Sequence, residues 1–248
     1  MKQRDPIQLQ DSYESISRQA ANRIEAALEQ NPSLLLCAAG GSTPARAYEL
    51  LVESKKQNPA AFASLRVVKL DEWGGIAMDD PGSCETQLKK QLINPLAVAS
   101  NRYYSLQSNS ESPEKVCQQM RNHLAAVGPI DLCILGLGVN GHIGMNEPAA
   151  TLEPFTHVAT LSEVSLRHPM LKSSRTPAFG LTLGMVEILS SREILLLVNG
   201  TAKREALRTL LRREITTDFP ASFLWLHSNW TLLCEPDAAG GLNLQPST

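Results

Sequence analysis

The sequence has few of the features that mark nucleic-acid-binding or membrane proteins. It balances 23 Lys and Arg against 25 Asp and Glu, for a formal net charge of -2, and its basic residues are scattered. Without a basic cluster, binding to nucleic acid is not expected. Residues 1–10 lack the apolar core of a signal peptide, and the longest apolar stretches, Leu34–Ala39 and Ile194–Val198, are too short to span a bilayer. These absences predict a cytoplasmic protein with a small-molecule partner and no membrane contact.

Patterns typical of metal sites and disulfides are absent as well. The five cysteines form no C-x-x-C pair, and Cys37 and Cys133 lie within apolar segments that have the composition of strands. The five histidines are dispersed and form no H-x-x-x-H pair. We therefore expect buried thiols, and neither a metal nor another cofactor.

Short apolar segments alternate with amphipathic ones along the chain, without an internal repeat or a low-complexity linker. At 43% hydrophobic content, a chain of 248 residues can bury a full core. The alternation predicts one domain over residues 1–248, a three-layer α/β/α sandwich with a mostly parallel, doubly wound sheet. The later segments include a helix predicted over Leu181–Leu189 and strands predicted over Ala221–Leu226 and Trp230–Cys234.

The segment Pro129–Pro148 reads P-I-D-L-C-I-L-G-L-G-V-N-G-H-I-G-M-N-E-P and joins a strand to a polar, glycine-rich loop. Ile130–Leu135 is typical of a strand buried on both faces of a parallel sheet. The loop then lies at the carboxyl edge, where open α/β sheets bind ligands. Its Asn140, His142 and Glu147 suit acid/base chemistry. The alternative is an ordinary turn in which His142 caps a helix or bonds a neighbour.

Two other strand ends have the character of anion sites. One predicted strand runs into Gly40, Gly41, Ser42 and Thr43, a turn before a helix that presents backbone N–H groups, hydroxyls and the positive end of a helix dipole. Another strand runs into G-T-A-K, where Lys203 occupies the first turn of a helix, a position that the dipole disfavours unless an anion is bound. Both predict phosphate contacts. For the first, a plain turn capped by Thr43 is the alternative.

Two adjacent acids, Asp71 and Glu72, follow the predicted strand Leu65–Leu70. Because the strand places them at the edge of the sheet that holds ligands, one of them is a candidate base, and Glu72 is a candidate substrate contact. The alternative is a solvated turn in which Glu72 points outward.

The motifs G-G-S-T-P, L-D-E-W, G-H-I-G-M-N-E-P, L-T-L-G and G-T-A-K occur in this order. Together they resemble the glucosamine/galactosamine-6-phosphate isomerase and deaminase family over nearly the whole chain. P-G-S-C-E-T and P-A-S-F-L-W-L-H-S-N are most similar to its galactosamine-6-phosphate branch. Related 6-phosphogluconolactonases share the G-H signature but usually lack the N-E-P ending, so the resemblance favours a deaminase over a lactonase.

The resemblance implies a role for several residues. Asp71 matches the proton-transferring base, His142 the histidine that opens the sugar ring, and Glu147 the carboxylate that works with it. Gly40–Thr43 and Lys203 match phosphate contacts. Arg167 falls where the glucosamine enzymes place a phosphate-binding arginine, within the segment Arg167–Arg175, which fits either a mobile flap or a surface loop; Arg175 is the other candidate for that contact.

Two departures concern the substrate. Asn140 stands where glucosamine deaminases have an aspartate, so Glu147 is left to orient His142, and Trp73 replaces a common tyrosine. These changes favour galactosamine 6-phosphate, converted to tagatose 6-phosphate and ammonia, over glucosamine 6-phosphate. The runners-up are a 6-phosphogluconolactonase-type hydrolase and a non-catalytic sugar-phosphate sensor. The family contains both monomers and homo-oligomers.

Overall fold

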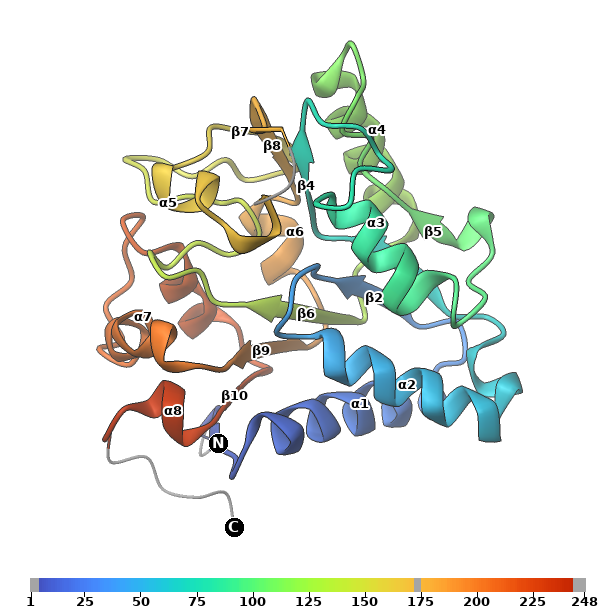
Figure 1. The fold of residues 1–248 in the computed structure, drawn as a ribbon, viewed down its shortest axis with the longest axis horizontal. Coiled ribbons are helices and arrows are strands. Elements are labelled where there is room, and N and C mark those ends of the chain that lie inside the picture. The colour runs from blue at the N-terminus through green and yellow to red at the C-terminus, as the bar shows by residue number, and fades with distance from the viewer. Residues whose placement is uncertain (1–4, 172–174, 243–248) are drawn as a thin grey trace.

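A parallel sheet forms the centre of the computed structural model, which describes residues 5–171 and 175–242 (Figure 1). Over this part of the chain the sheet has seven strands in the order β1-β10-β9-β6-β2-β3-β5, all paired in parallel. Its strands are β1 (Ile7–Leu9), β2 (Leu35–Ala38), β3 (Arg66–Lys69), β5 (Tyr103–Tyr104), β6 (Leu132–Gly136), β9 (Ile194–Val198) and β10 (Trp230–Cys234).

Helices cover both faces of this sheet. The α-helices of the described residues are α1 (Tyr13–Gln30), α2 (Ala45–Gln57), α3 (Cys84–Leu88), α4 (Pro113–Val127), α5 (Glu163–Leu166), α6 (Met185–Leu189), α7 (Arg204–Leu210) and α8 (Pro236–Ala239). Within the described ranges, no helix is both long enough and apolar enough to cross a bilayer.

Alternate residues of each central strand belong to two separate apolar cores. Along β2, Leu36 packs with α1, α2 and α3, whereas Cys37 packs on the opposite face with α4, α6 and α7. All residues of β2 and β9 are buried, which explains why these strands are apolar throughout instead of alternating. The predicted three-layer fold with a mostly parallel sheet is confirmed.

The chain reverses its direction of travel across the sheet between β2 and β6. From β2 it moves outward through β3 to β5, and then returns to β6 on the other side of β2 and continues through β9 to β10. The loops that leave β2 and β6 therefore diverge from neighbouring strand ends. In open α/β sheets, such a switch point is where ligands bind.

A second, smaller sheet was not predicted. Strands β4 (Asp71–Gly74), β8 (Phe179–Thr182) and β7 (His157–Ala159) pair antiparallel in the order β4-β8-β7. Asp71 and Glu72, expected at the carboxyl end of the strand Leu65–Leu70, therefore begin a separate strand. The helix predicted over Leu181–Leu189 is likewise divided into the end of β8 and the short α6.

The segment Ala221–Leu226 was predicted to be a strand and is instead part of a 3-10 helix, Pro220–Leu226. Pro220 occupies its first turn, where the missing N–H costs nothing. Within a central strand, the same proline would remove a hydrogen bond from the ladder.

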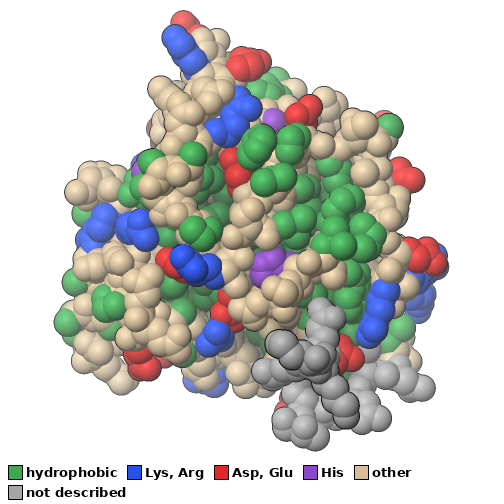
Figure 2. All heavy atoms as spheres, turned by 180° about the vertical axis from the view of Figure 1, so that it is seen from behind, with side chains coloured by type: hydrophobic (Ala, Val, Ile, Leu, Met, Phe, Trp, Pro, Cys, Tyr) green, Lys and Arg blue, Asp and Glu red, His purple; other side chains and the backbone are tan. Residues whose placement is uncertain are grey.

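Charged side chains of both signs are interspersed on the face shown in Figure 2. Hydrophobic side chains gather in the middle of this face, and the charged groups lie mainly around them. This distribution agrees with the small formal net charge of -2.

We predict that Leu196→Ala, in the fully buried centre of β9, lowers the free energy of unfolding by about 2–5 kcal/mol, because it leaves a cavity between two covered faces. Urea denaturation measures the change. The control Leu226→Ala, at a side chain 64% exposed, should change it by no more than about 0.5 kcal/mol. Equal effects from both substitutions would contradict this account of the core.

Candidate active site

One cavity of about 380 Å³ opens at the switch point, beside the carboxyl ends of β2, β3, β6 and β9. Residues from separate loops and elements line it. Among them are Gly40, Gly41, Ser42, Thr43, Asp71, Trp73, Cys84, Gly138, His142, Ser165, Arg167, His168 and Lys203. The structure thus brings together residues that lie more than 160 positions apart in the sequence.

Asp71 begins β4 and lies against the cavity, where water does not fully stabilise its negative charge. This burial, together with the negative charge of Glu72, raises the pKa of Asp71 to about 6, while His142 acts in the opposite direction. Cys84 Sγ lies 3.6 Å from Asp71 Oδ1 and donates a weak hydrogen bond to it. A carboxylate with a pKa near neutrality is suited to accept and return a proton.

Glu72, expected to contact the substrate, does not line the cavity. Its side chain is fully buried and forms an ion pair with Lys69, at 2.7 Å. Its oxygens also accept hydrogen bonds from the backbone N–H groups of Trp73, Cys84 and Glu85. Glu72 is buried while Asp71 lines the cavity because neighbouring side chains of a strand, here β4, point to opposite sides.

His142 is held by polar groups on one side of its ring. Its Nδ1 lies 3.6 Å from Glu147 Oε2 and 3.4 Å from Ser165 Oγ. Its other ring nitrogen, Nε2, has no hydrogen-bond partner within residues 5–171 and 175–242. The imidazole lines the cavity, so this nitrogen is available for proton exchange with a ligand.

Glu147 lies behind His142 and accepts several hydrogen bonds. Asn140 Nδ2 donates to its Oε2 at 2.9 Å, and the Ser165 hydroxyl donates to its Oε1. Although burial opposes ionisation, the hydrogen bond and charge of His142, with these donors, lower the pKa of Glu147 to about 2. The carboxylate is therefore ionised at neutral pH and suited to orient the imidazole. Asn140 contacts Glu147 rather than the cavity.

Gly138 and Gly144, in the loop after β6, leave room for neighbouring side chains. A Cβ at Gly138 would lie 2.5 Å from His142 Cγ, so any side chain there would displace the imidazole. Gly144 has a φ of 58°, and a Cβ on it would lie 2.7 Å from the Thr182 hydroxyl. Backbone in this left-handed region favours glycine.

The turn of Gly40–Thr43 and Lys203 lie together along the same cavity. The Thr43 hydroxyl donates to Asn199 Oδ1 at 2.8 Å and so ties the loop after β2 to the loop after β9. Lys203 ends a 3-10 turn, Thr201–Lys203, directly before α7. Burial lowers its pKa, and within the described residues its ammonium has no ion-pair partner. A cation so placed lacks the anion that would balance it.

Arg167 and Arg175, the two candidate phosphate contacts, are both exposed. Arg167 lines the cavity, but its side chain is 80% exposed and pairs with Glu163 at 2.9 Å. Arg175 is exposed and is not part of the cavity lining. Part of the predicted flap or surface loop, 172–174, lies outside the described residues. The preceding residues form a 3-10 turn, Pro169–Leu171.

Three polar side chains of the cavity lining were not identified from the sequence: Cys84, Ser165 and His168. The ring centroid of His168 lies 5.9 Å from that of Trp73. Burial, followed by the charges of Lys203 and His142, lowers the pKa of His168 and favours its neutral form. Cys84 lies within the motif P-G-S-C-E-T, which assigned it no role, whereas Ser165 and His168 belong to none of the motifs. Folding brings all three to the site.

The fold and the site define an α/β protein in which a titratable aspartate and histidine, a glycine turn and an uncompensated lysine line one cavity at the switch point of a parallel sheet. Residues 8–233 match the family model of glucosamine-6-phosphate isomerases/6-phosphogluconolactonase. The chain belongs to this family, as the order of the sequence motifs indicated.

Known relatives cover almost the whole chain. It is 40% identical to the Escherichia coli (strain K12) protein named "Putative deaminase AgaI", over 92% of this chain and 90% of the relative. It is 35% identical to glucosamine-6-phosphate deaminase 1 of Bacillus subtilis (strain 168), over 92% and 96%.

Among solved structures, a monomeric glucosamine-6-phosphate deaminase superposes with a TM-score of 0.89 at 34% identity, covering 95% of this chain and 99% of that one. The 6-phosphogluconolactonase of Trypanosoma brucei has a TM-score of 0.79 at 19% identity, over 96% and 99%. The second likeness shows a shared fold only.

We predict that Gly138→Ala displaces the imidazole of His142, because the added methyl group would overlap the ring. The side-chain NMR signals of His142 should shift in the folded variant. Gly136→Ala, at the end of β6, is the matched control, since a Cβ there has no neighbour within 4 Å. Unchanged His142 signals in Gly138→Ala would show that the ring does not depend on this glycine.

Proposed function

We propose that the protein is a cytoplasmic deaminating isomerase that converts galactosamine 6-phosphate to tagatose 6-phosphate and ammonia. The observation that carries this proposal is the placement of Asp71 and His142 in one cavity with Lys203 and the turn of Gly40–Thr43. Two groups that can move protons then share a binding site with two features that suit a phosphate. Deaminases among the relatives support the same reaction class.

The reaction requires proton transfers at two parts of the sugar. The substrate rests as a ring, so His142 first moves a proton at the ring oxygen and the hemiacetal opens to the aldehyde. Asp71 then removes the proton on C2 and delivers it to C1, by way of an enolamine. The product of this transfer is an imine at C2, to which water adds as ammonia leaves, giving the ketose.

The ionisation of the two carboxyl groups suits these steps. A pKa of about 6 leaves Asp71 mainly ionised at neutral pH, yet makes it a stronger base than an exposed aspartate. Glu147, with a pKa of about 2, stays ionised and stabilises the imidazolium that forms on His142. Environments that push two carboxyl groups apart in pKa commonly divide the acid/base roles.

The phosphate end provides binding energy remote from the reacting carbons. Backbone N–H groups before α2 and the Lys203 ammonium can hold a phosphate at one end of the cavity, which fixes C1 and C2 relative to Asp71. Arg167 is a further candidate contact from the rim.

The choice of the galacto epimer depends on the polar groups beside the sugar. Trp73 lines the cavity and presents an indole where a phenol would offer an acceptor. Asn140 contributes only indirectly, since it bonds Glu147. Glucosamine 6-phosphate, the substrate named for several relatives, is the alternative.

We expect the purified protein to release ammonia from galactosamine 6-phosphate with a higher kcat/KM than from glucosamine 6-phosphate, and to do so without added metal or cofactor. Asp71→Asn should reduce the rate at least about a hundredfold while the sugar phosphate still binds. Preference for the gluco epimer would reverse the substrate assignment alone. Failure to release ammonia from either epimer would refute the reaction.

We expect Lys203→Ala to weaken binding of the sugar phosphate by about 1.5–3 kcal/mol, the usual worth of a charge-assisted hydrogen bond. Calorimetric titration with either epimer measures the change in Kd. Arg208→Ala is the matched control, because Arg208 lies on the exposed side of α7 and pairs with Glu205. If Lys203→Ala binds as tightly as this control, Lys203 does not hold the phosphate.

A further inference from the structure

We propose that Glu72 and Cys84 are positioning residues that tune Asp71 as a base from two sides. Neither residue has an assigned role, and the proposal rests on the proposed function of Asp71. Glu72 follows Asp71 in β4 but points into the protein, whereas Cys84 opens α3 and faces the carboxylate across the cavity wall.

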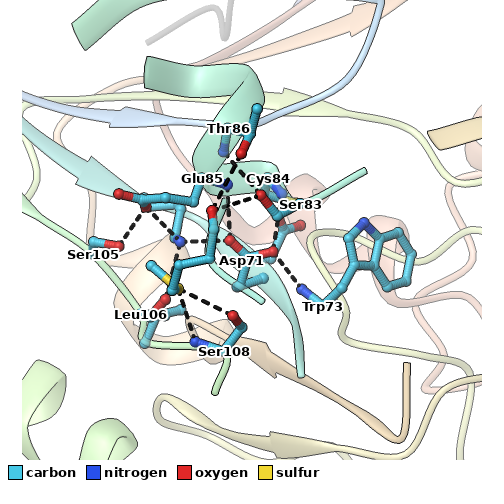
Figure 3. Close-up of polar contacts among 12 residues, drawn as sticks. Asp71, Trp73, Ser83, Cys84, Glu85, Thr86, Ser105, Leu106 and Ser108 are labelled. Carbon is cyan, nitrogen blue, oxygen red and sulfur yellow. Dashed lines mark hydrogen bonds and ion pairs between the residues drawn. The ribbon is translucent and has the colours of Figure 1, made fainter. Parts of the chain in front are cut away.

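Glu72 joins the strand that carries Asp71 to the first turn of α3. Its Oε1 accepts hydrogen bonds from the N–H groups of Trp73 at 2.8 Å and Cys84 at 2.9 Å. Its Oε2 accepts from the N–H of Glu85 at 2.8 Å and from Lys69 Nζ at 2.7 Å. Four donors on three segments therefore depend on one buried carboxylate. Three of the residues that donate, Trp73, Cys84 and Glu85, are labelled in Figure 3.

Lys69, in β3, is the fourth donor to Glu72 and is itself fully buried. Besides Glu72, its ammonium donates to Glu85 Oε2 at 2.9 Å and to the carbonyl oxygen of Leu106 at 3.0 Å. Glu85 is also bonded by Ser105 Oγ at 2.6 Å. The Lys69 ammonium is thus shared between Glu72 and Glu85, and Glu85 also pairs with Lys89 Nζ at 3.0 Å.

Cys84 is the part of this arrangement that contacts the base. Burial and the neighbouring carboxylates raise the pKa of its thiol well above its usual value, so sulfur keeps its proton and donates to Asp71 Oδ1 at 3.6 Å. The backbone N–H of the same residue is bonded to Glu72. Glu72 therefore also fixes the position from which the thiol reaches Asp71.

Glu72 and Cys84 shift the pKa of Asp71 in opposite directions. Burial raises its pKa most, the charge of Glu72 raises it further, and His142, Cys84 and Lys69 lower it. Removing the charge of Glu72 should therefore weaken the base, and removing the Cys84 thiol should strengthen it. A purely structural role for either residue predicts no such pair of opposite shifts.

The test is a 13C NMR titration of the Asp71 carboxyl group, assigned with Asp71→Asn, in the whole protein and its variants. For Glu72→Gln we expect the pKa of Asp71 to fall from about 6 by roughly one unit. For Cys84→Ala we expect it to rise. Glu72→Asp, which keeps the charge, should retain a raised pKa, and thermal unfolding records whether each variant is folded.

The acid limb of kcat/KM for ammonia release should move with the same signs, to lower pH in Glu72→Gln and to higher pH in Cys84→Ala. An unmoved carboxyl titration in folded Glu72→Gln would overturn the proposal, even if activity is lost. Should Glu72→Gln not fold, Cys84→Ala decides: an upward shift supports the proposal and no shift overturns it. Because the NMR titration needs no turnover, failure of the proposed function would be recognised separately.

Discussion

The pairing of β2 with β6 is the contact on which the site depends. These strands lie in register at Leu36 with Leu132 and Cys37 with Cys133, although they are separated by almost a hundred residues. Because the chain reverses its course across the sheet here, the loops that leave the two strands open a cavity between them. The glycine turn of Gly40–Thr43 and the loop of His142 face one another only through this pairing.

The second constraint is the cost of holding charge away from water. Asp71 has a raised pKa, so the folded state binds its proton more tightly than the unfolded chain. As pH rises from about 3.8 to about 6, ionising Asp71 therefore reduces stability. Glu147 has the opposite shift: its contribution is present above about 4.5 and is lost as pH falls through about 2. At neutral pH, ionised Asp71 therefore lowers the stability of the folded state, whereas ionised Glu147 raises it.

The small antiparallel sheet gives the neighbouring residues Asp71 and Glu72 different surroundings. If Asp71 and Glu72 lay in a loop, both could turn to solvent. Pairing of β4 with β8 forces them to opposite sides, so that one faces the cavity and the other meets Lys69 in the interior. The same arrangement places Cys84 beside the base, since Glu72 holds the first turn of α3. Functional and structural carboxylates thus lie next to each other in the chain with separate surroundings.

The sequence by itself determined the layered α/β fold, because buried parallel strands require continuous apolar runs such as Ile194–Val198. It also determined the family, since strand ends that bind ligands carry recognisable glycine and polar patterns. Only the tertiary structure decided that Glu72 is buried and that Ser165, His168 and Cys84 belong to the site. These positions depend on contacts between distant segments. Even Cys84, which lies in the motif P-G-S-C-E-T, has no local signal that shows its contact with Asp71. The pairing of β4 with β8 is of the same kind, because each strand has only four residues and gains its stability from its partner.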